Sequence, residues 1–399
     1  MILKDGLLLI NDELVKKDIL IEDGIITKIE DEIDGEDVLD CSSCFVMEGA
    51  VDVHVHLREP GFTHKETIKT GTMALAKGGI TTALAMPNLK PCPDSIENLE
   101  IEEEIIRKDA LINVYPYASV SKDQLGEEIS DLEELAKRVY AITDDGFGVN
   151  NLEVLTKAME IAKQNIIVMA SQAEDKINPY APEGEYVAVR REVNFAKSIG
   201  CKYHFCHMST KESFEAILKA RKEGYTNITF EVSPHHLLLN EEMIKDANWK
   251  MNPPLRSEEN RLATIKALLE TEGVVIASDH APHSEEEKSR EYNKCPNGIL
   301  GAETMLPLIY TNFVATGLAT HKDFLNWLVY NPIKIFNLPR KKIAVGEVAD
   351  ITVLDIKNKR KYLKEEILSI GKNSPYIGME LLGFPRYTIL NDKLIWRAK

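Results

Sequence analysis

The chain has 399 residues, a formal net charge of −16, and 44% hydrophobic and 28% charged residues. This composition is typical of a globular protein and excludes wholesale disorder. Because the charge is strongly negative and no Lys/Arg block is present, we do not expect nucleic acid or anionic membranes as partners. We find no signal peptide, no run of 18 apolar residues and only six scattered cysteines. These features predict a cytoplasmic protein with reduced thiols.

The two ends of the chain share a pattern of short strands and turns. An Asp23-Gly24 turn signal separates apolar segments near the start, and residues 348–355 alternate apolar and polar side chains near the end. The predicted strands are Gly6–Ile10, Asp18–Glu22, 24–29, Val348–Asp355, Tyr387–Leu390 and Lys393–Trp396. We therefore predict that residues 1–47 and 342–399 together form one small β-sandwich domain.

The middle of the chain alternates apolar runs with amphipathic helical stretches, the pattern of repeated βα units. The eight runs are Ala50–Leu57, Gly79–Met86, Ile112–Ser119, Val139–Thr143, Asn165–Ser171, Lys202–His207, Ile228–Ser233 and Val274–Ser278. The helical stretches include Lys65–Lys77, Leu152–Lys163, Tyr186–Ser198, Lys211–Glu223 and Glu258–Leu269. This α/β pattern predicts a (β/α)8 TIM barrel over residues 48–341. An open doubly wound sheet is the alternative, but no glycine-rich phosphate-binding turn follows the early runs.

Polar residues close most of these runs. The active site of a TIM barrel lies at the carboxyl ends of its strands, whereas incidental polar residues should scatter among strands and helices. The residues at the run ends are His54, His56, Asn88, Asp145, Gln172, His207 and Asp279. Their shared position predicts one functional site.

The histidine pair indicates a metal. His54 and His56 are two residues apart on a predicted strand, so both imidazoles face the same side. Histidine nitrogens and carboxylates are the ligands of catalytic zinc. Asp279 follows the eighth run, where a carboxylate can both ligate a metal and shuttle a proton. The alternative for Asp279 is a turn or helix-cap aspartate, against which Pro282 and the strand-end position argue.

Two further candidates follow the fourth and sixth runs. The triplet Asp144-Asp145-Gly146 is ordinary turn chemistry, yet its position predicts a carboxylate, Asp145, that can bridge two cations. Which of the two aspartates ligates is left open by the residues alone. His207 lies nearer its run end than His204. We therefore predict His207 as the ligand and His204 as a packed or supporting histidine.

Two more features lie close to the predicted site. Arg58 follows the histidine pair, where a guanidinium can grip a substrate carboxylate with two hydrogen bonds, although a surface arginine is the alternative. The charged segment Ser284–Asn297 follows the eighth run. It is either a solvated face or a mobile lid above the site.

Seven motifs, in order along essentially the whole chain, resemble class I dihydroorotase of the amidohydrolase superfamily. They are His54-Val-His56-Leu-Arg58-Glu-Pro-Gly61, Met86-Pro-Asn88, Thr143-Asp-Asp145-Gly, Cys206-His207-Met-Ser-Thr210, Ser233-Pro-His-His236, Met251-Asn252-Pro-Pro-Leu-Arg256 and Ser278-Asp279-His-Ala-Pro-His283. The resemblance implies reversible, zinc-dependent cyclisation of N-carbamoyl-L-aspartate to L-dihydroorotate, a step of de novo pyrimidine (UMP) biosynthesis. It also implies a small-molecule substrate and, as a possible partner, aspartate transcarbamoylase.

The resemblance implies a role for each site residue. The ligands of one zinc are His54, His56 and Asp279, and those of a second zinc are His207 and a bridging Asp145. The substrate-binding residues are Arg58, Asn88, Asn252 and His283, with the backbone at Asn297 and Gly298 closing over the ring. Asp279 is the catalytic acid and base, and it protonates the departing nitrogen in the hydrolytic direction.

Two departures from the family pattern qualify these roles. Some relatives bridge their metals with a carboxylated lysine, but Lys137 precedes the fourth run, so the aspartate-bridged type fits better. The family also places a histidine where this chain has Gln172. Because a neutral amide is a poorer zinc ligand than imidazole, we predict that the second metal is weakened or absent. Two rival functions stay open: a hydantoinase or allantoinase, and a non-catalytic dihydroorotase-like partner of aspartate transcarbamoylase.

Overall fold

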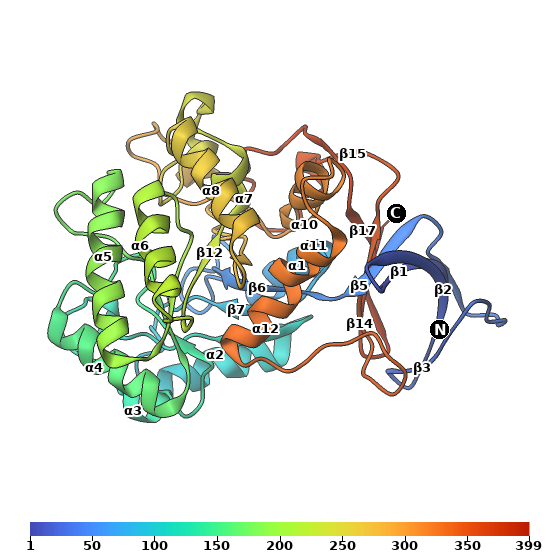
Figure 1. Cartoon of the computed structure of the whole chain (residues 1–399), viewed down its shortest axis with the longest axis horizontal. Coiled ribbons are helices and arrows are strands. Elements are labelled where there is room, and N and C mark those ends of the chain that lie inside the picture. The colour runs from blue at the N-terminus through green and yellow to red at the C-terminus, as the bar shows by residue number, and fades with distance from the viewer. Residues whose placement is uncertain (399) are drawn as a thin grey trace.

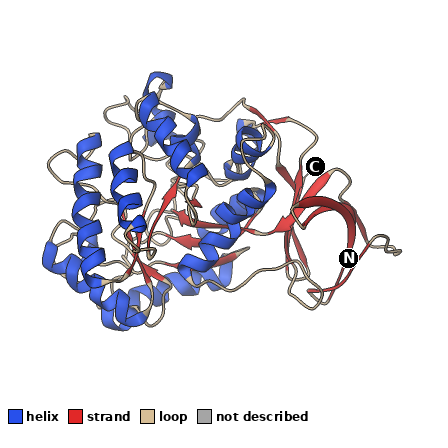
Figure 2. Ribbon diagram, viewed as in Figure 1, coloured by secondary structure: helices blue, strands red, loops and turns tan. Residues whose placement is uncertain are grey.

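The computed structural model describes residues 1–398 and has two regions, one of alternating helices and strands and one made almost entirely of strands (Figures 1 and 2). Eight parallel strands run through the α/β region, and each lies within one of the eight predicted apolar runs. They are β6 (Ala50–Val55), β7 (Ile80–Ala85), β8 (Asn113–Pro116), β9 (Ala141–Ile142), β10 (Val168–Ser171), β11 (Lys202–Phe205), β12 (Ile228–Val232) and β13 (Val275–Ile276). The predicted α/β class is therefore confirmed.

These strands pair in sequence order within two hydrogen-bonded sheets. One sheet has the order β6-β7-β8, and the other has the order β13-β12-β11-β10-β9. Isolated parallel bridges join Ala118 to Ile142 and Val55 to His280, at the two places where the sheets adjoin. The carboxyl ends of all eight strands consequently point to one end of this region, as parallel pairing requires.

The helices follow the strands along the chain and cover them in Figure 2. They are α1 (Ile68–Lys77), α2 (Ile96–Asp109), α3 (Leu132–Leu135), α4 (Leu152–Asn165), α5 (Pro182–Ile199), α6 (Lys211–Lys222), α7 (Pro234–Leu238), α8 (Glu258–Glu270), α9 (Glu285–Lys288), α10 (Met305–Ile309), α11 (His321–Leu325) and α12 (Asn331–Phe336). Their ends carry ordinary signals: Thr67 caps α1, Asn151 caps α4, and α5 begins at Pro182 and ends before a left-handed Gly200. Within the described chain, no helix is long and apolar enough to cross a membrane.

The two ends of the chain pair with each other, as the sequence predicts. Their strands are β1 (Ile2–Ile10), β2 (Glu13–Glu22), β3 (Ile25–Glu30), β4 (Val38–Asp40), β5 (Cys44–Glu48), β14 (Asp350–Asp355), β17 (Phe384–Leu390) and β18 (Lys393–Arg397). They form one eight-stranded sheet of order β18-β17-β14-β5-β1-β2-β3, with β4 beside β1. The predicted sandwich of two sheets is therefore wrong. A register shift between Leu3 and Gly6 interrupts the β1–β2 pairing, and the single sheet curls around its own apolar core.

Part of the C-terminal segment lies outside this sheet. The short hairpin of β15 (Arg360–Lys361) and β16 (Glu380–Leu381), and the chain between its strands, contribute buried residues such as Tyr362 and Tyr376 to an apolar cluster that also contains Trp249. The C-terminal segment thus reaches both regions of the molecule.

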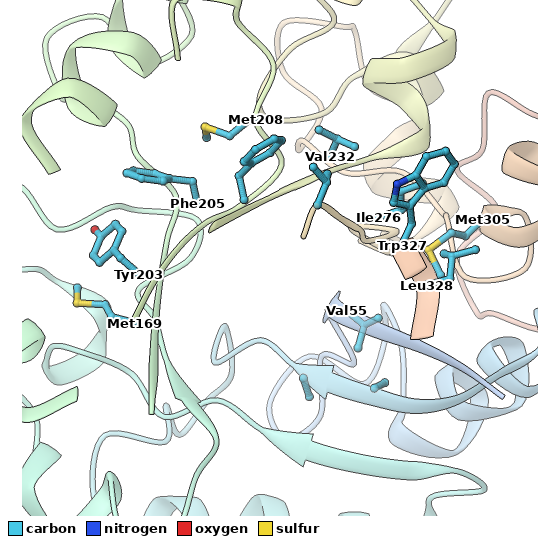
Figure 3. Packing of buried hydrophobic residues seen from close by; sticks show 14 of the residues in the cluster. Val55, Met169, Tyr203, Phe205, Met208, Val232, Ile276, Met305, Trp327 and Leu328 are labelled. Atoms are coloured by element: carbon cyan, nitrogen blue, oxygen red, sulfur yellow. The ribbon is translucent and has the colours of Figure 1, made fainter. Parts of the chain in front are cut away.

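The main core lies between the strands and the helices of the α/β region. Figure 3 shows Met169, Tyr203, Phe205 and Val232 on the strands, with Trp327 packed over the far end of the same layer. Burial of such side chains contributes about 1.5–3 kcal/mol each. This packing holds the strand ends, and the polar residues that follow them, in fixed positions.

Candidate active site

A cavity of about 390 Å³ opens at the carboxyl ends of the strands, a size that suits a small ring-shaped ligand. Every residue that the sequence assigned to the site lines this cavity except His54, which is completely buried beneath it. The predicted residues in the lining are His56, Arg58, Asn88, Asp145, His207, Asn252, Asp279, His283, Asn297 and Gly298. The structure therefore brings together side chains that are up to 244 positions apart in the sequence, from His54 to Gly298.

Histidines and carboxylates converge at the floor of the cavity. The Nε2 atom of His54 lies 3.4 Å from Asp145 Oδ1 and 3.5 Å from Asp279 Oδ1. The Nε2 atom of His56 lies 3.3 Å from Asp279 Oδ1 and 3.6 Å from Asp145 Oδ2. His207 Nε2 is 3.6 Å from Asp145 Oδ1. All five side chains are buried.

This cluster fits a metal ion. Two ligands that each lie 2.0–2.1 Å from a tetrahedral zinc are separated by about 3.3–3.4 Å, close to the separations among His54, His56, Asp145 and Asp279. His54 Nε2 and Asp145 Oδ1 are buried and have no hydrogen-bond partner among residues 1–398, which is costly unless a further group satisfies them. One ligand atom each from His54, His56 and Asp145 lies within 4.8 Å of the others.

The electrostatics of the cluster also favour a cation. Burial by itself lowers the pKa of His54, but the charges of Asp145 and Glu231 raise it well above its ordinary value. Burial likewise opposes ionisation of Asp279, yet His54 and His56 hold the pKa of this carboxyl well below its ordinary range. The carboxylates around His54 therefore favour positive charge at the floor of the cavity.

Glu231, on β12, supports the cluster and was missed by the sequence reasoning. Its Oε1 lies 2.6 Å from His54 Nδ1, its Oε2 lies 3.1 Å from His204 Nε2, and its Oε1 also accepts a hydrogen bond from the backbone N–H of His207. A carboxylate on Nδ1 fixes the tautomer and leaves Nε2 free to ligate. The available signal was a charged residue inside the otherwise apolar run Ile228–Val232.

Asp144 and His204 form hydrogen bonds with groups outside the cluster. Asp144 faces away from the cluster and accepts hydrogen bonds from the backbone N–H groups of Val120 and Ser121, so it orders the loop while Asp145 faces the histidines. His204 bonds Thr229 Oγ1 and Glu231 rather than the cluster. His235 and His236, from the Ser233-Pro-His-His236 motif, are both buried.

Gln172 lies in the cavity wall, but its side-chain amide is already hydrogen bonded. Its Oε1 accepts a 2.8 Å hydrogen bond from Gly146 N–H, and its Nε2 donates to Glu174 Oε2 at 2.6 Å. Glu174 Oε2 also accepts from Asn252 Nδ2 at 2.9 Å. Gln172 therefore joins three loops by hydrogen bonds, where an imidazole could have faced the metal cluster.

The upper cavity wall offers charge and free acceptors. Arg58 donates its Nε–H to Pro282 O at 3.4 Å, and burial lowers its pKa to about 10, so it stays cationic at neutral pH. Asn88 Oδ1 and Asn252 Oδ1 are buried without a hydrogen-bond partner in the described part of the chain. His283 donates from Nε2 to Asn297 O at 2.7 Å. Burial and the charges of Arg58 and Lys65 lower the pKa of His283 to about 2, so this imidazole is neutral.

Backbone conformation at the site is constrained. Arg58, His207 and Asp279 have φ values of 61°, 34° and 48°, in the left-handed region that non-glycine residues seldom adopt. Gly298 has φ of 134°, and a Cβ there would meet Ala281 O at 2.7 Å. Such conformations cost about 1–3 kcal/mol each and persist where surrounding structure holds them.

Comparison with known proteins agrees with this geometry. A family model described as dihydro-orotase-like matches residues 44–180. The chain is 41% identical to a dihydroorotase of Macrococcus caseolyticus, over 99% of this chain and 98% of that protein, and 42% identical to a dihydroorotase of Fusobacterium nucleatum, over 100% and 99%. The chain belongs to the dihydroorotase family.

The fold of this dihydroorotase family member is also found in more distant enzymes. The L-hydantoinase (dihydropyrimidinase) from Arthrobacter aurescens superimposes with a TM-score of 0.87 over 99% of this chain and 96% of that chain, at 23% identity. A likeness at this identity shows a shared fold alone. It carries no argument about substrate.

Proposed function

We propose that this protein is a dihydroorotase, an enzyme that reversibly and zinc-dependently cyclises N-carbamoyl-L-aspartate to L-dihydroorotate in pyrimidine biosynthesis. Full-length identity of 41–42% to dihydroorotases is the observation that carries the proposal. The buried cluster of histidines and aspartates beneath a cavity with one buried arginine supports it. Zinc, when bound, supplies Lewis-acid polarisation of the ring carbonyl and activates water.

The proposed zinc ligands are the residues of the floor cluster. His54 and His56 direct Nε2 toward Asp279, and Asp145 contacts both histidines. Thiolates are absent from this ligand set, which therefore matches the imidazole and carboxylate sites of hydrolytic zinc enzymes. His207 and Asp145 are the residues available to a second ion.

We assign the proton transfer to Asp279. In hydrolysis, its carboxylate takes a proton from the attacking water, a C–O bond forms at the ring amide carbon, and the C–N bond breaks. Asp279 then delivers the proton to the departing nitrogen. The reverse sequence closes the ring. The neighbouring histidines hold the pKa of Asp279 below its ordinary range, so the carboxyl is ionised at neutral pH.

The proposed substrate contacts follow from the cavity wall. Arg58 pairs with the substrate carboxylate, because it is the buried guanidinium that lines the cavity. Asn88 and Asn252 offer buried amide oxygens to ring N–H groups, and His283 offers its free Nδ1. Both backbone groups of Gly298 are bonded within the protein, through its N–H to Lys250 O and its carbonyl to Lys288, so we assign it to the shape of the wall.

We propose that one zinc is bound tightly and that the second is weak or absent. The Gln172 amide is held by Gly146 and Glu174, so it cannot turn a lone pair toward His207 without breaking both hydrogen bonds. A Gln172→His variant supplies the missing imidazole and should raise zinc stoichiometry from one toward two per chain. Two zincs held tightly by the unaltered protein would contradict this assignment.

The remaining architecture stays a proposal as well. The bridges between Ala118 and Ile142, and between Val55 and His280, support closure of the two sheets into one (β/α)8 barrel over residues 48–341. Residues 1–47 and 342–399 are the proposed second domain, although residues 360–382 pack on the barrel side. A cytoplasmic location and an aspartate transcarbamoylase partner are further predictions.

One assay separates the candidate functions. Purified protein with added Zn²⁺ is given L-dihydroorotate, hydantoin and allantoin separately, and its zinc content is measured. We expect turnover of dihydroorotate alone. Turnover of hydantoin or allantoin instead would favour the hydantoinase or allantoinase alternative, and no turnover of any substrate by zinc-loaded protein would favour the non-catalytic partner.

A further inference from the structure

We propose that Asn373, from the C-terminal segment, is a positioning residue that holds the substrate-facing loop after β13, an inference that rests on the proposed function. The loop leaves the barrel at Ala281 and returns at Gly298. It carries His283, a proposed substrate contact, and Asn297, whose carbonyl accepts a hydrogen bond from His283. Neither the sequence motifs nor the predicted division into domains links Asn373 to this site.

The Asn373 side chain joins both ends of the loop. Its Nδ2 donates to Ala281 O at 3.1 Å and to Gly298 O at 2.9 Å, and its Oδ1 accepts from the backbone N–H of His283 at 3.1 Å. Its own carbonyl accepts from Leu300 N–H at 2.9 Å. Asn373 is 2% exposed, so water does not replace these bonds readily. One side chain thereby satisfies three backbone groups at the base of the loop.

The segment that carries Asn373 is itself anchored near the start of α1. Glu66, which precedes α1, accepts hydrogen bonds from Ser369 Oγ and from the backbone N–H of Ile370. Gly371 passes so close to the loop that a Cβ there would lie 2.8 Å from His283 O. The backbone of His283 is thus held by the C-terminal segment, whereas its imidazole bonds Asn297 O within its own loop.

Lys288 makes a second, separate set of hydrogen bonds where the loop returns to the strands. Lys288 is buried, and its Nζ donates to Lys250 O, Pro296 O and Gly298 O at 3.0–3.3 Å. Gly298 O therefore accepts from both Lys288 and Asn373. Loss of Asn373 leaves the loop tied at Lys288 and through Ala281 N–H to Ile299 O, but it leaves Ala281 O and the backbone N–H of His283 without their partner. The expected consequence is a displaced His283 on an otherwise folded loop.

The test compares Asn373→Ala with Asn358→Ala, a matched control in the same C-terminal segment. The exposed Asn358 side chain bonds only Asp355 among the described residues. For Asn373→Ala we expect KM for dihydroorotate to rise about tenfold or more, kcat to change far less, and zinc content to stay constant. Hydrogen exchange should accelerate in residues 281–298 and not elsewhere. The control should match the unaltered protein in all four measurements.

Distinct results separate the possible failures. Unchanged KM together with unchanged exchange in residues 281–298 would overturn the proposal, as would a loss of stability with no change in KM. If the unaltered protein does not turn over dihydroorotate, the proposed function fails, whereas the exchange measurement still tests the loop tie. If Asn373→Ala does not fold, Asn373→Ser, which retains one donor and one acceptor, should give a smaller rise in KM.

Discussion

The two ends of the eight parallel strands differ in whether their buried polar atoms have hydrogen-bond partners. At the carboxyl end, several buried side-chain atoms around the cavity lack partners, including His54 Nε2, Asp145 Oδ1 and Asn252 Oδ1. At the amino end lies a larger cavity, of about 740 Å³, lined in part by Lys202, Arg221 and Asn331. Within residues 1–398, no residue of that lining has a buried side-chain nitrogen or oxygen without a partner.

Arg221 and Lys202, at the amino end, already have hydrogen-bond partners. Arg221 donates to the carbonyls of Thr226, Ile228 and Glu272, and Lys202 donates to Ile335 O and to Asn337 Oδ1. The difference teaches that cavity size does not locate the chemistry here. Several of the unsatisfied polar atoms gather where a ligand or metal can satisfy them, whereas elsewhere their burial destabilises the fold. Side chains at the carboxyl end should therefore affect activity, and those at the amino end should affect stability.

The largest expected effect is at Asp279. Asn is the suitable replacement, because it tolerates the left-handed backbone at φ 48° and keeps the side-chain shape. Asp279→Asn should lower turnover of dihydroorotate at least about 10³-fold, since it removes the proton acceptor and a charged ligand. Asp323→Asn, at the amino-end cavity, is the control and should retain activity, because an asparagine Oδ1 can still accept the hydrogen bond from the backbone N–H of Thr320, the N-cap of α11. Full activity of Asp279→Asn would contradict the conclusion that side chains at the carboxyl end carry the activity.

The next effect concerns metal affinity. Glu231→Gln removes the negative charge from His54 Nδ1 and should weaken zinc binding about 10–100-fold, measured by competition with a chelator. Glu192→Gln is a matched control, since Glu192 is a buried glutamate that bonds Ser171 and Tyr203 rather than a histidine. Equal zinc affinities of the two variants would show that Glu231 only fills space.

Part of this site was predictable from the sequence. His54 and His56 were found because a spacing of two on a strand places both rings on one side, and Asp279 because it follows an apolar run. The apolar runs between amphipathic helical stretches located all eight parallel strands. Local pattern was sufficient wherever a side chain's direction depends on its own strand.

The remainder depends on contacts between distant segments. Glu231 joins His54 across 177 positions, and Asn373 joins His283 across 90. No local period encodes such a pairing. The single curled sheet was missed for a similar reason, because alternation shows which face of a strand is buried but not which strands pair with it. The choice between Asp144 and Asp145 likewise required the turn geometry.

A smaller effect, on stability alone, is expected at the amino end. Arg221→Met leaves three backbone carbonyls without their donor and should lower the free energy of unfolding by about 2 kcal/mol. The kcat and KM for dihydroorotate should stay unchanged, because the site is at the other end of the strands. The exposed neighbour Lys222 provides the control variant Lys222→Met, which should change neither property. An altered KM in Arg221→Met would indicate that the two ends are coupled.

The smallest effect tests a buried polar atom that lies away from both cavities. Glu102, on α2, is 1% exposed with its Oε2 unpartnered, and burial raises its pKa well above the ordinary value. Below the pKa of the unfolded chain both states are protonated. As pH rises above it, the unfolded state ionises first, so the folded state loses stability until the folded pKa is passed.

Replacing Glu102 with an apolar residue of similar length should remove this loss. Glu102→Met should therefore stabilise the protein by about 1–2 kcal/mol at pH 8 and by less at pH 5, since each unit of pKa elevation corresponds to about 1.4 kcal/mol. Urea unfolding at both pH values measures the difference, with the exposed Glu104→Met as control. A gain that is equal at pH 5 and pH 8 would mean that the Glu102 carboxyl is not the cause. A Glu102→Met protein that is less stable at pH 8 would instead mean that this carboxylate has a partner. In that case Glu102 would be a satisfied buried group, like the polar groups at the amino-end cavity.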